Sequence, residues 1–128
     1  MSYETIWEEE GVYQCFSGQV SPDEKIHASS EVHGDPRFDT INYWITDNIG
    51  VDSYVLEKSD AEKLAYLNNA ASRSNPDIVT PFISTHITHR DNIIHYLIHL
   101  KKIGSPWKGK LFEDVQTARQ WISTLQST

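Results

Sequence analysis

Four of the six histidines lie in one segment, HITHRDNIIHYLIHL, between residues 86 and 100. Within it His95 and His99 are four residues apart, a spacing that places two imidazoles on one side of a helix, where they could bind zinc. Zinc needs three or four converging ligands. The other histidines belong to the start of this helix or to a different predicted helix. We therefore expect no metal site.

The apolar residues of the same segment give its histidines a simpler role. On a helical wheel Ile93, Leu97 and Leu100 share one side, and His95 and His99 lie opposite. Asp91 precedes His95 by four residues, so the two can pair on the outer side. We expect a helix that buries its apolar side chains and exposes its histidines to solvent.

No other motif predicts catalysis. The chain has no G-x-S-x-G turn and no glycine-rich phosphate loop, which argues against hydrolases of that type and against nucleotide-dependent enzymes. Cys15 lies within a predicted strand without a nearby cation, so we interpret it as a core residue. A hydrolase that uses Asp47 and His86 would need the two side chains within hydrogen-bond reach. The sequence favours a protein that is not an enzyme and needs no cofactor.

Composition narrows the class of protein and its partners. With 128 residues, 38% hydrophobic and 11% aromatic, residues 1–128 suit a single globular domain. The net charge of −7 would repel a phosphate backbone, so nucleic acid is not an expected partner. A single cysteine, no export signal and no apolar run of membrane-spanning length predict a cytoplasmic protein with at most peripheral membrane contact.

Runs of β-branched and aromatic residues alternate with capped, helix-periodic segments. Strands are predicted over residues 3–8, 12–17, 41–46, 77–84 and 109–113. Helices are predicted to begin at the caps Ser21, Ser59, Thr88 or Asp91, and Asp114. The order β-β-α-β-α-β-α-β-α predicts a layered α/β domain, with an N-terminal hairpin and a mixed sheet of about five strands.

Three local features refine this plan. Gly11 is predicted in the hairpin turn, and the nearly continuous apolar run 41–46 in the middle of the sheet. Pro81 lacks a backbone donor, which implies an edge strand or a bulge. In GDPRFD (34–39) we interpret Gly34 as a helix cap and Phe38 as a core residue.

Polar residues follow the central strand in TDNIGVDS (46–53). Ligands of open α/β sheets bind beyond the carboxyl ends of parallel strands, near helix N-termini. If the chain has a binding edge, we expect it there. The candidate residues for this ligand or partner edge are Asp47, Asn48, Asp52, Ser53, Ser59, Thr85 and His86.

Five segments together carry a family resemblance: GDPRFD (34–39), YWITDNIGVDS (43–53), ASRSNP (71–76), GSPW (104–107) and LFEDVQTARQWI (111–122). With the order of elements, the chain resembles the small bacterial SpoIIAA-like proteins of the STAS (sulfate transporter and anti-sigma factor antagonist) superfamily over essentially its whole length. The resemblance implies a layered α/β fold and a non-enzymatic, regulatory role through protein contacts. It also implies nucleotide or lipid binding in some relatives.

The resemblance is incomplete at the regulatory serine. Anti-sigma antagonists carry a phosphorylatable serine in an Asp-Ser-Ser-Gly stretch at a helix start. Here Asp52 and Ser53 match its first two residues, but Tyr54 and Val55 follow them. Ser59 matches only by its predicted cap position. The departure argues against a phosphorylation switch.

Two functions remain open. The first is a module that binds a protein partner, as a homodimer or with another protein, through the edge that carries Asp47, Ser53 and Ser59. The second is a carrier of a small apolar or anionic ligand, lipid or nucleotide, at a membrane surface. A cavity lined by Trp44, Phe82 and Leu97 would favour the carrier, and a filled core would favour the partner-binding module.

Overall fold

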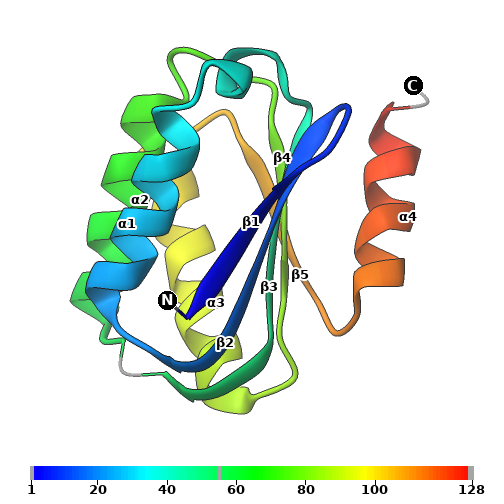
Figure 1. Cartoon of the computed structure of the whole chain (residues 1–128). Coiled ribbons are helices and arrows are strands. Elements are labelled where there is room, and N and C mark those ends of the chain that lie inside the picture. Colours follow the sequence, from blue (N-terminus) through cyan, green and yellow to red (C-terminus); the bar gives the residue numbers. More distant parts are fainter. Residues whose placement is uncertain (1, 55, 127–128) are drawn as a thin grey trace.

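The computed structural model describes residues 2–54 and 56–126, which form one five-stranded sheet and four α-helices (Figure 1). The strands are β1 (Tyr3–Trp7), β2 (Gly11–Val20), β3 (Tyr43–Tyr54), β4 (Val79–Ile83) and β5 (Lys108–Phe112). They lie in the order β1-β2-β3-β4-β5, with β1 and β2 antiparallel and the other neighbours parallel. The predicted α/β class, with a mixed sheet and an N-terminal hairpin, is confirmed.

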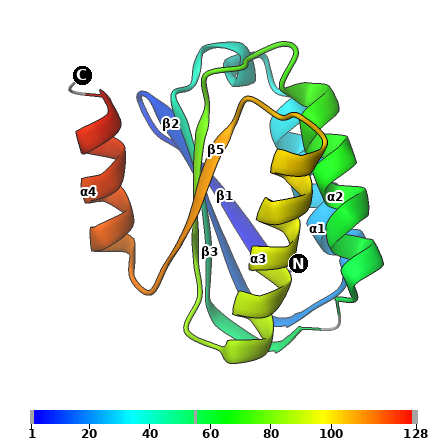
Figure 2. The ribbon, with the colours of Figure 1, turned by 180° about the vertical axis from the view of Figure 1, so that it is seen from behind.

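The helices cover the two faces of the sheet unequally (Figures 1 and 2). The helices α1 (Pro22–His33), α2 (Lys58–Ala71) and α3 (Ile87–Lys102) pack on one face, here called the helix-rich face. The opposite face, here called the α4 face, carries only α4 (Val115–Gln126). A short 3-10 helix, Pro36–Thr40, joins α1 to β3. None of the described helices is both long enough and apolar enough to cross a bilayer.

Two predicted helix caps are confirmed. The Oγ atom of Ser21 accepts a hydrogen bond from the N–H of Glu24 at 3.2 Å, and Gly34 follows the last turn of α1. An oxygen of Asp114 accepts from the N–H of Thr117 at 2.7 Å at the start of α4. These side chains replace the carbonyl partners that the first helical N–H groups lack.

The other two caps differ from the prediction. The helix α2 begins before Ser59, at the cap residue Glu57, whose N–H donates to the Asp60 carboxylate at 2.9 Å. The helix α3 begins before Thr88, because Nδ1 of His86 accepts the N–H of Thr88 at 3.2 Å. A carboxylate and an imidazole nitrogen thus accept hydrogen bonds at the starts of α2 and α3, where we had predicted hydroxyl caps.

The strand β3 is central, as predicted, but it is longer than the 41–46 run. It includes TDNIGVDS, because residues from Tyr43 to Tyr54 pair with β2 over its whole length. The predicted edge position of Pro81 is wrong, since β4 lies between β3 and β5. The missing donor instead interrupts the ladder with β3, which pairs Tyr43 with Val79 and resumes only at Thr46.

Gly11 lies at the start of β2, and not in the hairpin turn. A Cβ atom there would fall 2.3 Å from the ring of Tyr43, far inside van der Waals contact. Glycine is therefore needed because the tyrosine ring covers its Cα.

Each face of the sheet has its own apolar core. On the helix-rich face a cluster contains Val12, Val32, Phe38, Ile41, Trp44, Ile78 and Trp107. On the α4 face a cluster contains Tyr43, Ile45, Val79, Ile83, Phe112, Ala118 and Ile122. Phe38 is buried, as predicted. The helix α4 contributes Ala118 and Ile122 to the cluster on its own face.

Candidate ligand-binding pocket

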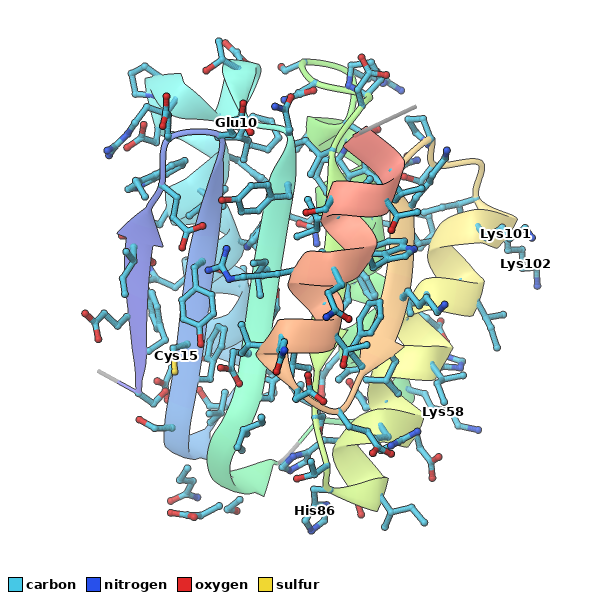
Figure 3. The ribbon with its side chains drawn as sticks, turned by 90° about the vertical axis from the view of Figure 1, so that its right-hand side faces the viewer. Glu10, Cys15, Lys58, His86, Lys101 and Lys102 are labelled. Carbon is cyan, nitrogen blue, oxygen red and sulfur yellow. The ribbon has the colours of Figure 1, made fainter. Side chains whose placement is uncertain are left out.

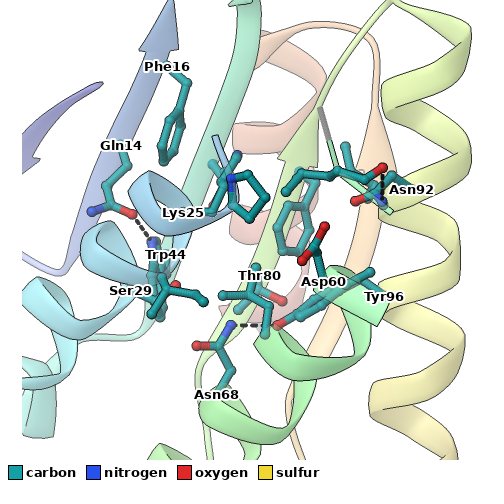
Figure 4. Close-up of a pocket in the computed structure, with 18 of the residues that line it drawn as sticks. Gln14, Phe16, Lys25, Ser29, Trp44, Asp60, Asn68, Thr80, Asn92 and Tyr96 are labelled. Carbon is teal, nitrogen blue, oxygen red and sulfur yellow. Dashed lines mark hydrogen bonds between the residues drawn. The ribbon is translucent and has the colours of Figure 1, made fainter. Parts of the chain in front are cut away.

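A narrow pocket lies on the helix-rich face, between the sheet and the helices α1, α2 and α3 (Figure 4). Its cavity of about 40 Å³ has room for roughly three water molecules. A larger ligand therefore needs side chains or helices to move apart. The apolar part of the wall is formed by Phe16, Trp44, Leu64, Phe82, Ile93 and Tyr96.

Hydrogen bonds fix several polar groups of the wall. Trp44 Nε1 donates to Gln14 Oε1 at 3.0 Å, and Gln14 Nε2 donates to the carbonyl oxygen of Ala28 at 3.0 Å. The Asn68 amide donates to the hydroxyl of Tyr96 at 2.8 Å. The rings of Trp44 and Tyr96 are thereby held in place in the wall.

Lys25 is the unexpected residue of the wall. Its side chain is 6% exposed, its Nζ donates to Asn48 Oδ1 at 2.7 Å, and the same atom lies 3.7 Å from the centre of the Phe16 ring. Burial lowers the pKa of Lys25 from 10.5 to about 7. The sequence analysis missed it, although Lys25 precedes the buried Val32 by seven residues and so shares its helix side.

Buried polar atoms gather next to Lys25. Asn48 is 2% exposed, and its Nδ2 has no acceptor among the described residues. Ser84 is fully buried, and within the same part of the chain its Oγ also has no partner. Because Asp47 pairs with Ile83, the residues after them, Asn48 and Ser84, are neighbours on β3 and β4.

His89, in the first turn of α3, belongs to the same surroundings. It is 2% exposed. Burial, together with the charges of His86 and Lys25, lowers its pKa from 6.5 to about 4. His89 is therefore neutral at physiological pH.

We predicted that Asp47 and Asn48 leave the strand at its carboxyl edge, and this prediction is wrong. They lie within β3 and, as successive strand residues, face opposite sides of the sheet. Asp47 is buried on the α4 face, where its carboxylate accepts from the hydroxyl of Tyr13 and from the N–H of Ile49. Asn48 lies beside Lys25. The two residues cannot form one site.

The remaining predicted residues lie at the carboxyl ends of the parallel strands and are exposed. Asp52 and Ser53 are in the last part of β3, and Ser59 is in the first turn of α2. Thr85 and His86 follow β4, and His86 projects at that end of the molecule (Figure 3). No hydrogen bond joins any two of these five within the described part of the chain. They form a surface edge and not a closed site.

The interpretation of His95 and His99 as a solvated helix side is wrong. Because α2 packs against this side of α3, His95 Nε2 lies 2.8 Å from Glu62 Oε2 and does not pair with Asp91. The ring of His99 packs against Tyr66 of α2, with ring centres 5.2 Å apart. In residues 2–54 and 56–126, no group of three or more His, Cys, Asp or Glu side chains is placed to hold a metal ion.

The side of α3 that faces solvent carries three isoleucines beside the exposed Asp91 and Lys101. Ile87, Ile94 and Ile98 are 74%, 42% and 62% exposed. They recur at spacings of seven and four residues and therefore form one stripe along the helix.

Neither catalytic alternative gains support from geometry. Cys15 is half-buried on the α4 face, where burial and the charge of Asp47 raise the pKa of its thiol and make it a poor nucleophile. Asp47 bonds to Tyr13, and His86 caps α3; no hydrogen bond joins Asp47 to His86 in the described residues.

No family model, curated protein or solved structure matches this chain. Its function is therefore inferred from its own residues.

Proposed function

We propose that this chain is a non-catalytic, STAS-like binding module that holds a small, largely apolar ligand between the sheet and the helices α1 to α3. The observation that carries the proposal is the pocket itself. Trp44 and Phe82 line it, whereas Leu97 packs on Gly109 of β5. Pockets with mostly apolar walls and a few placed polar groups are typical of small-molecule sites.

Several polar groups of the wall are already engaged in hydrogen bonds within the chain. The Thr80 hydroxyl donates to the carbonyl oxygen of Lys108 at 3.4 Å. The STAS-like assignment rests on the sequence resemblance, and the single free Cys15 favours a cytoplasmic location.

Native mass spectrometry of protein purified gently from its own host tests the proposal first. We expect an added organic mass on the 14.7 kDa chain. A chain without added mass that also fails to bind 1-octanol would contradict the proposal.

Substitutions in the pocket test where the ligand lies. Ala61 is 2% exposed and lines the pocket, so Ala61→Leu fills part of the cavity. We expect this variant to lose 1-octanol binding in NMR titrations. Ala70→Leu, on the exposed side of the same helix, is the matched control and should bind normally. If Ala61→Leu does not fold by circular dichroism, Ser29→Val fills the same cavity with a smaller change.

A protein-binding module is the second candidate, and the isoleucine stripe of α3 is the observation that favours it. Exposed apolar stripes of this kind are typical of contact surfaces. The predicted partner edge fits less well, since Asp47 is buried on the opposite face of the sheet. Sedimentation at rising concentration tests the homodimer, and Ile94→Gln should weaken any dimer that forms through the stripe.

A further inference from the structure

We propose that the isoleucine stripe of α3 binds the same stripe of a second copy of this chain, and that the two helices lie antiparallel in the dimer. The inference gives the second candidate function a defined partner and orientation. It does not depend on the ligand pocket, because the α3 residues that line the pocket, Asn92, Ile93 and Tyr96, lie on the opposite side of the helix.

The first argument is the exposure of the stripe. The helix α3 lies at the end of the helix layer, beside β5, and packs mainly against α2 and β5 (Figure 3). Neither element covers Ile87, Ile94 and Ile98, which are 74%, 42% and 62% exposed. A row of apolar side chains in water is unfavourable, and contact with a second apolar surface removes this cost.

The second argument is the order of the charges beside the stripe. Asp91 lies toward the N-terminus of α3 and Lys101 lies in its last turn, and both are exposed. At 100° per residue, both lie within about 40° of the centre of the stripe. Neither belongs to an ion pair in the described part of the chain. The stripe is therefore acidic toward one end and basic at the other.

An antiparallel second copy pairs the isoleucines and the charges in one register. When Ile94 of one copy faces Ile98 of the other, the two-fold axis passes level with Tyr96, midway between them. Asp91 and Lys101 are each five residues from this level, so Asp91 of each copy lies level with Lys101 of the other. Parallel copies would bring like charges together instead. The charges therefore favour a self-complementary, antiparallel contact.

The size of the contact sets the expected affinity. One helix side per copy is small for a protein interface, so the dimer should be weak. We expect a dissociation constant of about 50 μM, which leaves the chain monomeric at about 2 μM.

Sedimentation velocity at concentrations from about 2 to 500 μM spans this transition. Ile94→Gln should weaken the dimer at least about tenfold, because each dimer loses two buried isoleucine side chains. Ile6→Gln is the matched control, since Ile6 is 43% exposed and lies on β1, away from the stripe. This control should associate as the wild-type chain does.

Charge reversal tests the orientation. Asp91→Lys should weaken the dimer about fivefold at low salt, because it places two lysines together at each end of the contact. Asp91→Lys combined with Lys101→Asp restores both pairs and should associate as tightly as the wild-type chain. Glu10→Lys makes the same change in net charge in the β1–β2 turn, away from α3 (Figure 3), and should not weaken the dimer.

Three results would contradict the proposal. The first is a monomer at every concentration. The second is a dimer that Ile94→Gln leaves intact, because another surface then makes the contact. The third is a dimer that Asp91→Lys strengthens, which would make the antiparallel orientation wrong. If Ile94→Gln does not fold by circular dichroism, Ile98→Gln tests the same contact. Binding of 1-octanol is measured separately, so the failure of either proposal leaves the other standing.

Discussion

Each face of the sheet carries a polar cluster, and the two clusters differ in how completely their hydrogen bonds are satisfied. On the α4 face, the Glu8 carboxylate accepts from Arg119 at 2.8 and 3.0 Å and from the hydroxyl of Tyr43. The Asp47 carboxylate on the same face accepts from Tyr13. On the helix-rich face, by contrast, Lys25 bonds to an amide whose other end has no acceptor in the described chain.

This difference separates polar groups whose hydrogen bonds are made within the chain from groups such as Asn48 Nδ2, which has no acceptor among the described residues. A donor or acceptor left unsatisfied in the interior costs about 1–3 kcal/mol, so a fold keeps few of them without a reason. The hydrogen bonds among Glu8, Arg119 and Tyr43 are all made within the chain. Beside Lys25, Asn48 Nδ2 and Ser84 Oγ have no partner among the described residues.

The faces also differ in how they are covered. The helix α4 packs mainly against β3, β4 and β5, and the β1–β2 hairpin with Cys15 lies beside it (Figure 3). Ile6 of β1 is consequently 43% exposed on the same face where Ile45 is fully buried. The α4 face therefore contains a packed core position, Ile45, and an uncovered position, Ile6, that serves as its control.

The largest effect should come from the packed part of the α4 face. Ile45→Ala removes a fully buried side chain from the central strand, and we expect it to lower the free energy of unfolding by about 3 kcal/mol. Ile6→Ala, on the uncovered hairpin, should cost less than about 1 kcal/mol. Urea denaturation measures both, and equal losses would show that the hairpin is covered in solution.

Lys25 provides the next largest effect, with opposite sign. Its folded pKa of about 7 lies below its ordinary value of 10.5, so between these pH values the unfolded chain binds more protons and stability rises with pH. At pH 6 the full cost of the buried charge is present. We expect Lys25→Met to raise the free energy of unfolding by about 2 kcal/mol at pH 6 and by less at pH 9.

The surroundings of Lys25 make this pH test specific. Asp60 of α2 lines the same pocket as Lys25, and His89 of α3 lies close enough for the charge of Lys25 to act on it, while burial keeps the pKa of His89 near 4. Phe16 of β2 and Asn48 of β3 also contact Lys25, and both are uncharged. Urea denaturation at both pH values gives the result, with the exposed Lys102→Met as control. A constant difference between pH 6 and pH 9 would contradict the assignment.

The Glu8–Arg119 pair should give a smaller effect, because both side chains are partly exposed. Arg119 and Tyr43 lower the pKa of Glu8, so its contribution is present above the ordinary carboxyl pKa and is lost as pH falls through the folded value. A double-mutant cycle with Glu8→Gln and Arg119→Leu should give a coupling of about 0.5–1 kcal/mol at pH 7. The coupling should vanish at pH 2; persistence there would exclude a charge contribution.

The sequence predicts the elements well where the signals are local. Ser21 and Asp114 cap helices by a bond to an N–H three residues away, so the residues themselves carry the information. Pro81 led to a wrong prediction because the sequence does not distinguish a proline in an edge strand from a proline that interrupts a ladder in the middle of a sheet. Tertiary pairing decided between them.

The candidate pocket is harder to predict, because it depends on which helix sides meet. TDNIGVDS reads as a polar loop, and only its pairing with β2 makes it a strand that sends Asp47 and Asn48 to opposite faces. The histidines of α3 read as a solvent side until α2 covers them. The spacing of Lys25 from Val32 places it on the buried side of the helix. Lysine side chains are usually exposed, however, so this spacing alone did not predict that Lys25 is buried.

The smallest effect concerns the isoleucine stripe of α3. Ile98 is 62% exposed, so Ile98→Gln should change the free energy of unfolding by less than about 0.5 kcal/mol in urea denaturation. In a monomer, a side chain that is already exposed to water contributes little to the free energy of unfolding. A loss above about 1 kcal/mol that grows with protein concentration would mean that a second copy covers the stripe, because only association makes stability depend on concentration. The same loss at every concentration would instead mean that this side of α3 is packed within the chain.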